Sequence, residues 1–101
     1  MKMLLIIFRS SLEDELCRLL NKLGVTAYTE VTKVGGKGET GAALNTLTWP
    51  GGNTMILAAL TEDHADRVVE GVRVFRDESA QQRSASQVPL RVFALPCVQE
   101  V

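Results

Sequence analysis

The stretch "SLEDELCRLLNKLG", residues 11–24, decides the fold, because it predicts an amphipathic helix with both ends marked. Ser11 is expected to cap the first turn, where three acidic residues meet the positive end of the helix dipole. Gly24 stands where a left-handed glycine commonly ends a helix. The leucines recur at helical spacing and form one apolar stripe: Leu12, Leu16, Leu19, Leu20 and Leu23. One face of this helix should therefore pack on a core.

Strands are predicted on both sides of this helix. The apolar run "MLLIIF", residues 3–8, is typical of a central strand, buried on both faces or on one face and at a subunit interface. The β-branched run "VTAYTEVTKV", residues 25–34, predicts a second strand, and "NTMILAAL", residues 53–60, predicts a third.

The second half of the chain repeats the pattern. Thr61 is expected to cap a second helix, and the polar residues 77–88, "DESAQQRSASQV", are expected to form an exposed, mobile loop. The run "LRVFALPCVQEV", residues 90–101, predicts a fourth strand that Pro96 interrupts or ends. Apolar residues at helical spacing mark the inner face of the second helix: Ala65, Val68, Val69, Val72 and Phe75.

The order strand, helix, strand, strand, helix, strand predicts one α+β domain over residues 1–101 with a ferredoxin-like βαββαβ fold. Its four-stranded antiparallel sheet would carry both helices on one face. The strands are nearly all apolar, so the other face needs a partner as well. A homo-oligomer that packs sheet against sheet is the simplest way to cover it.

Composition excludes several classes of protein. A net charge of -1 argues against a basic face for nucleic acid. The longest apolar run is far too short to cross a membrane, and no signal peptide is recognisable, so we expect a cytoplasmic protein without membrane insertion. Cys17 and Cys97 are far apart and without a CxxC pattern. They favour two small buried apolar side chains over a disulfide or a redox switch.

Catalytic and metal-binding patterns are weak. His64 is the single histidine, and it is expected to be an exposed residue in the first turn of a helix rather than a metal ligand. The carboxylates of Glu13, Asp14 and Glu15 span less than one turn and point in different directions, which fits solubility better than a paired acid and base. No GxSxG or SxxK pattern accompanies the serines. We therefore expect neither an enzyme nor a metal site.

The glycine-rich segment "KVGGKGETGAALNTLTWPGGN", residues 33–53, joins the second and third strands. Its glycines leave backbone N–H groups free to converge on an anion, and Lys37 adds positive charge. The GxxxxGK[ST] spacing is absent, so it is not a P-loop, and a flexible connection is the alternative. Trp49 either packs into the core or faces a partner.

In "GVTAYTEVTKVGG", residues 24–36, the chain resembles the PII nitrogen-regulatory superfamily, whose members read much like "GITGMTVTEVKGFG" there. Gly24, Thr26, Thr29 and the glycines from Gly35 carry the likeness. The long segment between the second and third strands, about residues 35–52, corresponds to the PII T-loop. The likeness in topology extends over the whole chain, and the likeness in residues covers about 20–38.

The resemblance implies a homotrimer with inward-facing sheets and an adenine nucleotide (ATP, ADP or AMP) in each cleft between subunits. The effector sensed in this cleft is expected to be such a nucleotide or a small anion. Thr29 would lie near the adenine, and the backbone around Leu60 would read the base. Arg91 of the neighbouring chain would meet the phosphates, which Gly35, Gly36, Lys37 and Gly38 would also contact. The T-loop would regulate a membrane transporter or a metabolic enzyme in nitrogen regulation, through partner-facing residues that we expect to be Thr40, Leu44, Leu47 and Trp49.

The sequence departs from the family pattern at several places. PII proteins carry a second glycine-lysine motif after the second helix, whereas this chain has the polar stretch at residues 77–88, with Arg83 as its only basic residue. The T-loop has no tyrosine to accept a uridylyl group, and the C-terminal basic pair is reduced to Arg91. Three alternatives follow: a PII-like trimer that has lost nucleotide binding, a metal-related trimer similar to the CutA proteins, or a small ferredoxin-like enzyme.

Overall fold

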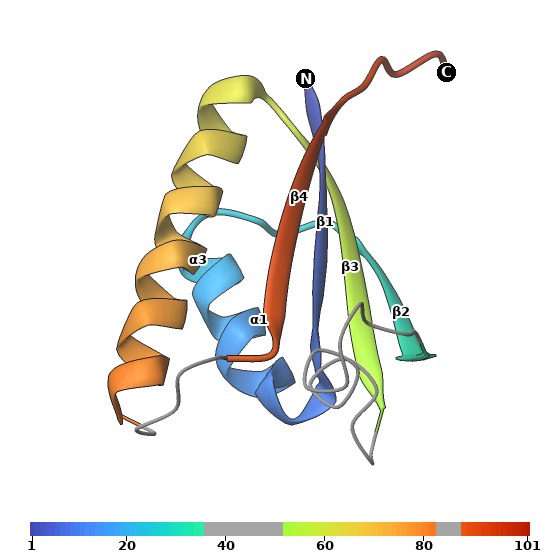
Figure 1. The fold of residues 1–101 in the computed structure, drawn as a ribbon. Helices are drawn as coiled ribbons and strands as arrows, with labels where there is room; N and C mark the ends of the chain where they lie inside the picture. The colour runs from blue at the N-terminus through green and yellow to red at the C-terminus, as the bar shows by residue number, and fades with distance from the viewer. Residues whose placement is uncertain (36–51, 83–87) are drawn as a thin grey trace.

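The computed structural model describes residues 1–35, 52–82 and 88–101. The strands of these ranges form one sheet, and two α-helices pack beside it (Figure 1). In chain order the elements are β1 (Lys2–Arg9), the 3-10 turn η1 (Ser10–Leu12), α1 (Glu13–Lys22), β2 (Thr29–Val34), β3 (Asn53–Leu60), α3 (Glu62–Gln82) and β4 (Leu90–Pro96).

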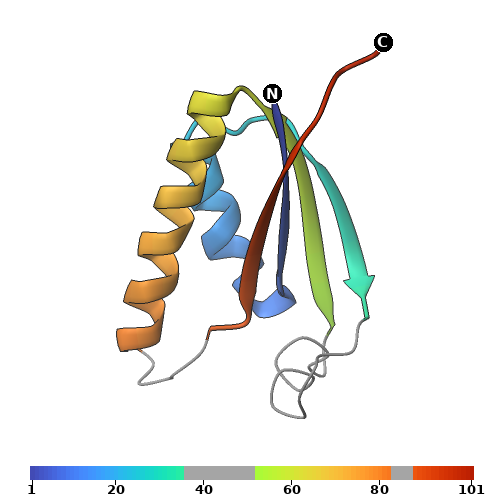
Figure 2. The same cartoon turned by 45° about the horizontal axis from the view of Figure 1, so that its top comes forward.

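The four-stranded sheet has the order β2-β3-β1-β4, and every neighbouring pair is antiparallel. Both α-helices cover the same face, as the two views in Figures 1 and 2 show. This arrangement confirms the predicted ferredoxin-like βαββαβ fold. It also leaves one face of the sheet without any cover from the described residues; we call this the open face.

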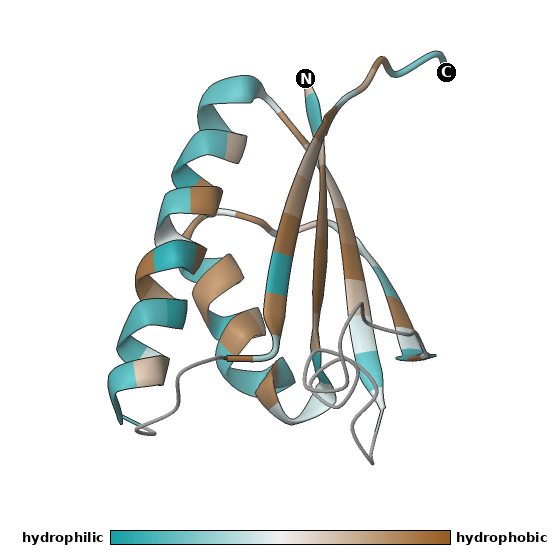
Figure 3. Cartoon of the chain, viewed as in Figure 1, coloured by the Kyte–Doolittle hydropathy of each residue, from teal (hydrophilic) through white to brown (hydrophobic). Residues whose placement is uncertain are grey.

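The core lies between the sheet and the helices. Alternation along β1 sends Leu4, Ile6 and Phe8 toward the helices, where each is fully buried. Leu16 and Leu20 of the predicted leucine stripe meet them from α1. From α3 come Ala65, Val68 and Val72. The central strand β1 is apolar along most of its length in Figure 3, as expected for a strand with two apolar faces, whereas polar residues interrupt β2, β3 and β4.

The open face is formed by the alternate strand residues, and the strand register places them in rows. One row runs from Thr29 through Leu57 and Leu5 to Phe93, because these residues are successive cross-strand partners. Phe93 and Leu95 remain 51% and 50% exposed. A single chain thus presents an apolar sheet surface to its surroundings.

Several predicted boundaries are wrong. Ser11 does not cap α1, which begins at Glu13 after a 3-10 turn that buries Leu12. The second strand begins at Thr29 rather than at residue 25. The predicted loop at 77–88 is helical as far as Gln82, and Ser79 within it is buried. The fourth strand ends at Pro96, as one of the two predicted outcomes allowed.

Candidate functional site

Thr29 lies at the edge of a shallow hollow on the open face. It begins the edge strand β2 and pairs with Leu57 of β3, so both side chains share that face. The hollow has a volume of about 490 Å³, and its lining residues are Met3, Ala27, Tyr28, Thr29, Leu57 and Ala59. An apolar floor of this size beside the hydroxyl-bearing residues Tyr28 and Thr29 suits a flat ring with a polar edge, and the volume falls within the usual range for small-molecule sites.

Leu60 ends β3 on the same side of the molecule, but its side chain is buried toward the helices. Only its backbone is available to a ligand in the hollow. That the backbone around Leu60 reads a base remains a prediction.

The two ends of the predicted T-loop lie close together at the opposite end of the sheet. Lys33 has a left-handed backbone (φ 57°), and the β2–β3 register is irregular between Val31 and Val34. A Cβ built on Gly52, itself left-handed at φ +82°, would lie 3.7 Å from Lys33 Cα. Gly35 faces open space on its Cβ side. The chain therefore leaves and re-enters the sheet at one place.

The remaining residues predicted for this segment lie outside the described residues. These are the expected phosphate contacts Gly36, Lys37 and Gly38 and the expected partner-facing residues Thr40, Leu44, Leu47 and Trp49. Their roles remain predictions.

Arg91 lies on the open face of the opposite edge strand. It pairs with Ile7 of β1, which pairs with Met55 of β3, which pairs in turn with Val31 of β2. Three strand spacings separate the two edges, which amounts to about 14 Å. A site that uses both Thr29 and Arg91 on a small ligand therefore needs two chains.

Asn53, a residue that sequence reasoning missed, begins β3 beside the two ends of the predicted T-loop. Its side chain is 3% exposed, and its Oδ1 atom is buried without a hydrogen-bond partner among the described residues. Asparagine after two glycines is typical of a turn. Nothing in the sequence therefore signals that this amide is enclosed.

A cluster of titratable groups joins α1 to β2 on the helix side. A hydrogen bond between the carboxyl groups of Glu13 and Glu30, together with partial burial and the negative charge of Glu30, raises the pKa of Glu13 above its ordinary value. The Tyr28 hydroxyl donates to Cys17 Sγ over 3.5 Å, and this hydrogen bond is the main cause that raises the pKa of Tyr28 to about 12. Cys17 and Cys97 are both free thiols and partly buried.

His64 has a structural role, and the expectation that it is simply exposed is wrong. Its Nε2 atom lies 2.7 Å from the carbonyl oxygen of Leu23 and donates to it, which ties α3 to the C-terminal end of α1. Its backbone N–H bonds to Thr61 Oγ1 at 3.3 Å, so Thr61 caps α3 as predicted. Within residues 1–35, 52–82 and 88–101, no three His, Cys, Asp or Glu side chains gather as a metal site.

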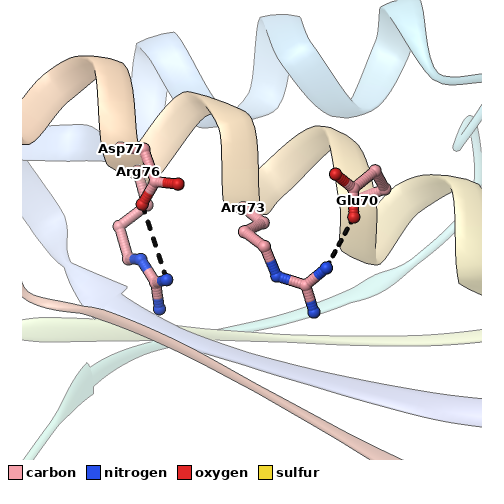
Figure 4. A network of polar contacts seen from close by, with 4 residues as sticks. All are labelled: Glu70, Arg73, Arg76 and Asp77. Carbon is pink, nitrogen blue, oxygen red and sulfur yellow. Dashed lines mark hydrogen bonds and ion pairs between the residues drawn. The ribbon is translucent and has the colours of Figure 1, made fainter.

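Two arginines of α3 project to one side of the helix (Figure 4). Arg73 pairs with Glu70, and Arg76 with Asp77, all in exposed positions. They flank a cavity of about 100 Å³ between α3 and β4, lined by Val69, Val72, Arg73, Arg76, Leu90 and Val92. Small-molecule sites usually begin at about 300 Å³, so this cavity is too small for a nucleotide.

The chain matches a known protein family along nearly its whole length. The family described as "P-II: Nitrogen regulatory protein P-II" matches residues 1–96. The chain belongs to the P-II family. It is thus a PII-like regulatory protein, and the resemblance seen in residues 24–36 is confirmed. No curated protein sequence matches the chain, and no helix in the described ranges is long and apolar enough to span a membrane.

Solved structures of PII-like proteins resemble this one along most of its length. CPII, a nitrogen regulatory PII-like protein from Thiomonas intermedia K12 bound to ADP, AMP and bicarbonate, is 26% identical, with a TM-score of 0.62 over 99% of this chain and 94% of that one. CPII bound to ADP, AMP and acetate is 26% identical, with a TM-score of 0.63 over 97% and 88%. A putative PII-like signaling protein from Thermus thermophilus shares the fold at 20% identity, with a TM-score of 0.58 over 93% and 82%.

Proposed function

We propose that this P-II family member is a non-enzymatic signalling homotrimer that senses an adenine nucleotide in each cleft between subunits. The observation that carries the proposal is the position of Thr29 and Arg91. They lie on opposite edge strands, so that neighbouring chains, and not one chain, can bring them to the same ligand.

The apolar open face supports the trimer. Leu5 and Leu57 lie at its centre, and Phe93 and Leu95 are half exposed beside them. Apolar surface that is gathered on one sheet face favours association, because water is released from it on burial. A three-fold arrangement with the sheets inward would cover this face in every subunit at once.

The hollow beside Thr29 is the proposed position of the adenine. The backbone around Leu60, which follows the lining residue Ala59 in β3, is proposed to read the base. From there, β2 leads toward Gly35 and the T-loop, where Gly36, Lys37 and Gly38 are proposed to contact the phosphates. Arg91 of the neighbouring subunit would supply positive charge to the same phosphates. The binding of ADP and AMP by CPII, a protein of the same fold, supports this choice of ligand.

The output of the sensor is proposed to be the T-loop. Its residues Thr40, Leu44, Leu47 and Trp49 would face a membrane transporter or a metabolic enzyme of nitrogen regulation in the cytoplasm. A bound nucleotide contacts the base of this segment and so would bias its conformation, which is how a small ligand controls a large partner.

Titration calorimetry with ATP, ADP and AMP, with and without hydrogencarbonate, tests the proposal alongside light scattering for the mass of the assembly. We expect a trimer that binds at least one of these nucleotides once per subunit. If the trimer gives neither heat nor a thermal shift with any of these nucleotides, nucleotide sensing is contradicted. The alternative of a PII-like trimer that has lost nucleotide binding would then be favoured. The absence of a trimer would contradict the whole proposal.

A further inference from the structure

A groove lies between α1 and α3, the two helices that cover the sheet on the side away from the open face (Figures 1 and 2). Its volume of about 490 Å³ equals that of the hollow beside Thr29 and falls within the usual range for small-molecule sites. The proposed trimer has its sheets inward, so this helix groove would stay accessible in the assembly. Its lining residues are Glu15, Arg18, Leu19, Asn21, Lys22 and Phe75.

The apolar part of the helix groove comes from both helices. Leu19 of α1 and Phe75 of α3 are partly buried and pack against the core, which holds their side chains in place. What remains of each side chain is open to the groove. Burial of such surface under a ligand releases water, so an apolar group is favoured here.

The cationic part comes from one side of α1. Arg18 and Lys22 are four residues apart, so their exposed side chains are neighbours on the helix surface. Arg18 Nε donates to the carbonyl oxygen of Asp14 over 3.3 Å. The terminal nitrogens of Arg18 and Nζ of Lys22 have no hydrogen bond or ion pair with any residue that the structure describes. Glu15, the one carboxylate of the lining, already takes part in an interaction of its own.

These two parts together define the chemistry of a ligand. A neutral apolar molecule would leave both cations unused, and a small polar anion would leave the apolar floor in water. A ligand that uses the whole groove has one negative group and one apolar body. A carboxylate suits the negative end, because arginine can donate two parallel hydrogen bonds to its oxygens while lysine adds charge.

We propose that the helix groove binds a small amphipathic carboxylate, with its apolar body on Leu19 and Phe75 and its carboxylate between Arg18 and Lys22. This is a second ligand site on the helix side of the molecule. It goes beyond the proposed nucleotide function and does not depend on it, because none of its residues lines the hollow beside Thr29.

The test is an amide NMR titration of the full chain with acetate, butyrate, octanoate and octylammonium, without nucleotide. Octanoate should shift the signals of residues 18–22 and of Phe75. From butyrate to octanoate the affinity should rise about fourfold for each methylene that the groove covers. Octylammonium has the same chain and the opposite charge, so it should bind at least about tenfold more weakly than octanoate.

The variant Arg18→Gln/Lys22→Gln removes both cations from the groove. The two positions are exposed, so the melting temperature should stay unchanged. Octanoate should bind about tenfold more weakly, and its advantage over octylammonium should disappear. Arg67→Gln/Arg73→Gln makes the same change in net charge at exposed positions of α3 outside the groove. This matched control should bind octanoate like wild type.

Three results would overturn the inference. Wild-type affinity in Arg18→Gln/Lys22→Gln, or equal binding of octanoate and octylammonium, would show that the cations select nothing. Octanoate shifts confined to the strands of the open face would place the ligand elsewhere. If an acidic, leucine-rich peptide bound at the groove and octanoate did not, the groove would be a contact for a partner protein instead of a small-molecule site.

Discussion

Replacing Phe93 by aspartate should dissociate the proposed trimer without unfolding the subunit. Phe93 lies in the middle of β4 on the open face, paired with Leu5, and is 51% exposed in the single chain. The core lies on the other side of the sheet, so an aspartate here should not disturb it.

The size of the effect follows from the area that the trimer would bury. A phenylalanine side chain offers about 200 Å², of which half, about 100 Å², remains exposed in the single chain. At about 25 cal/mol per Å² this is worth about 2.5 kcal/mol per subunit, or about 7.5 kcal/mol for three subunits. The aspartate adds the cost of an unpaired charge at the interface. Together these weaken the assembly by at least about five orders of magnitude.

Sedimentation velocity over a range of micromolar concentrations measures the change, and circular dichroism shows whether the subunit keeps its helices. Val74→Asp is the matched control, because Val74 is 47% exposed on α3, the helix side of the molecule. We expect a trimer for the control and folded monomers for Phe93→Asp. A trimer in both variants would refute the inward-facing sheet, and two unfolded variants would refute the placement of the core.

Three further predictions concern the contacts around α1. Because the pKa of Glu13 is raised in the folded state, its own contribution to stability is fully present below the ordinary carboxyl pKa and is lost as pH rises through the raised value. Glu30→Gln should flatten this dependence in urea denaturation between about pH 4 and 7. Tyr28 is the only tyrosine, so ultraviolet titration should report its pKa of about 12, and Cys17→Ala should lower it; a pKa of 10 in both proteins would contradict the hydrogen bond. His64→Ala should lower the free energy of unfolding by about 1 kcal/mol, and no change would show that its bond to the Leu23 carbonyl is not stabilising.

The elements that the sequence predicted correctly are those in which local periodicity and tertiary burial agree. The leucine stripe around Leu16 and Leu20 had a spacing that only a helix places on one face, and both leucines are in the core. The alternation of buried residues along β1 could not be read from the sequence, since "MLLIIF" is apolar at every position. One side of that strand faces the helices, and the other forms the open face.

Two predictions about helix ends were wrong: the loop predicted at residues 77–88 and the cap predicted at Ser11. Residues 77–82 continue α3 because glutamate, alanine and glutamine are good helix formers, and no glycine or proline interrupts them. Ser11 does not cap the helix, because it lies within a 3-10 turn that buries Leu12 and precedes α1. At Ser11 packing outweighed the local preference for a cap, whereas residues 77–82 follow their own helix propensity.

Only part of the candidate site could be predicted from the sequence. Thr29 came from a likeness to the PII family, and the register of β2 on β3 then placed it at the hollow. Thr29 and Arg91 lie on opposite edges of the sheet. Their separation depends on the strand order, so it could be worked out only from the structure. The burial of Asn53 could not be predicted, because nothing in the local sequence signals it.

The central claim is that Thr29 of one chain and Arg91 of the next bind the same adenine nucleotide. Complementation between subunits tests this claim most directly. Thr29→Phe should fill the hollow, and Arg91→Ala should remove the charge, so each homotrimer should bind ADP at least about tenfold more weakly than wild type. In trimers mixed at equal ratio, about one cleft in four pairs an intact Thr29 with an intact Arg91. Calorimetry should then find wild-type affinity at about that fraction of sites, whereas mixing that restores no tight site, or an Arg91→Ala trimer that binds ADP like wild type, would contradict the shared cleft.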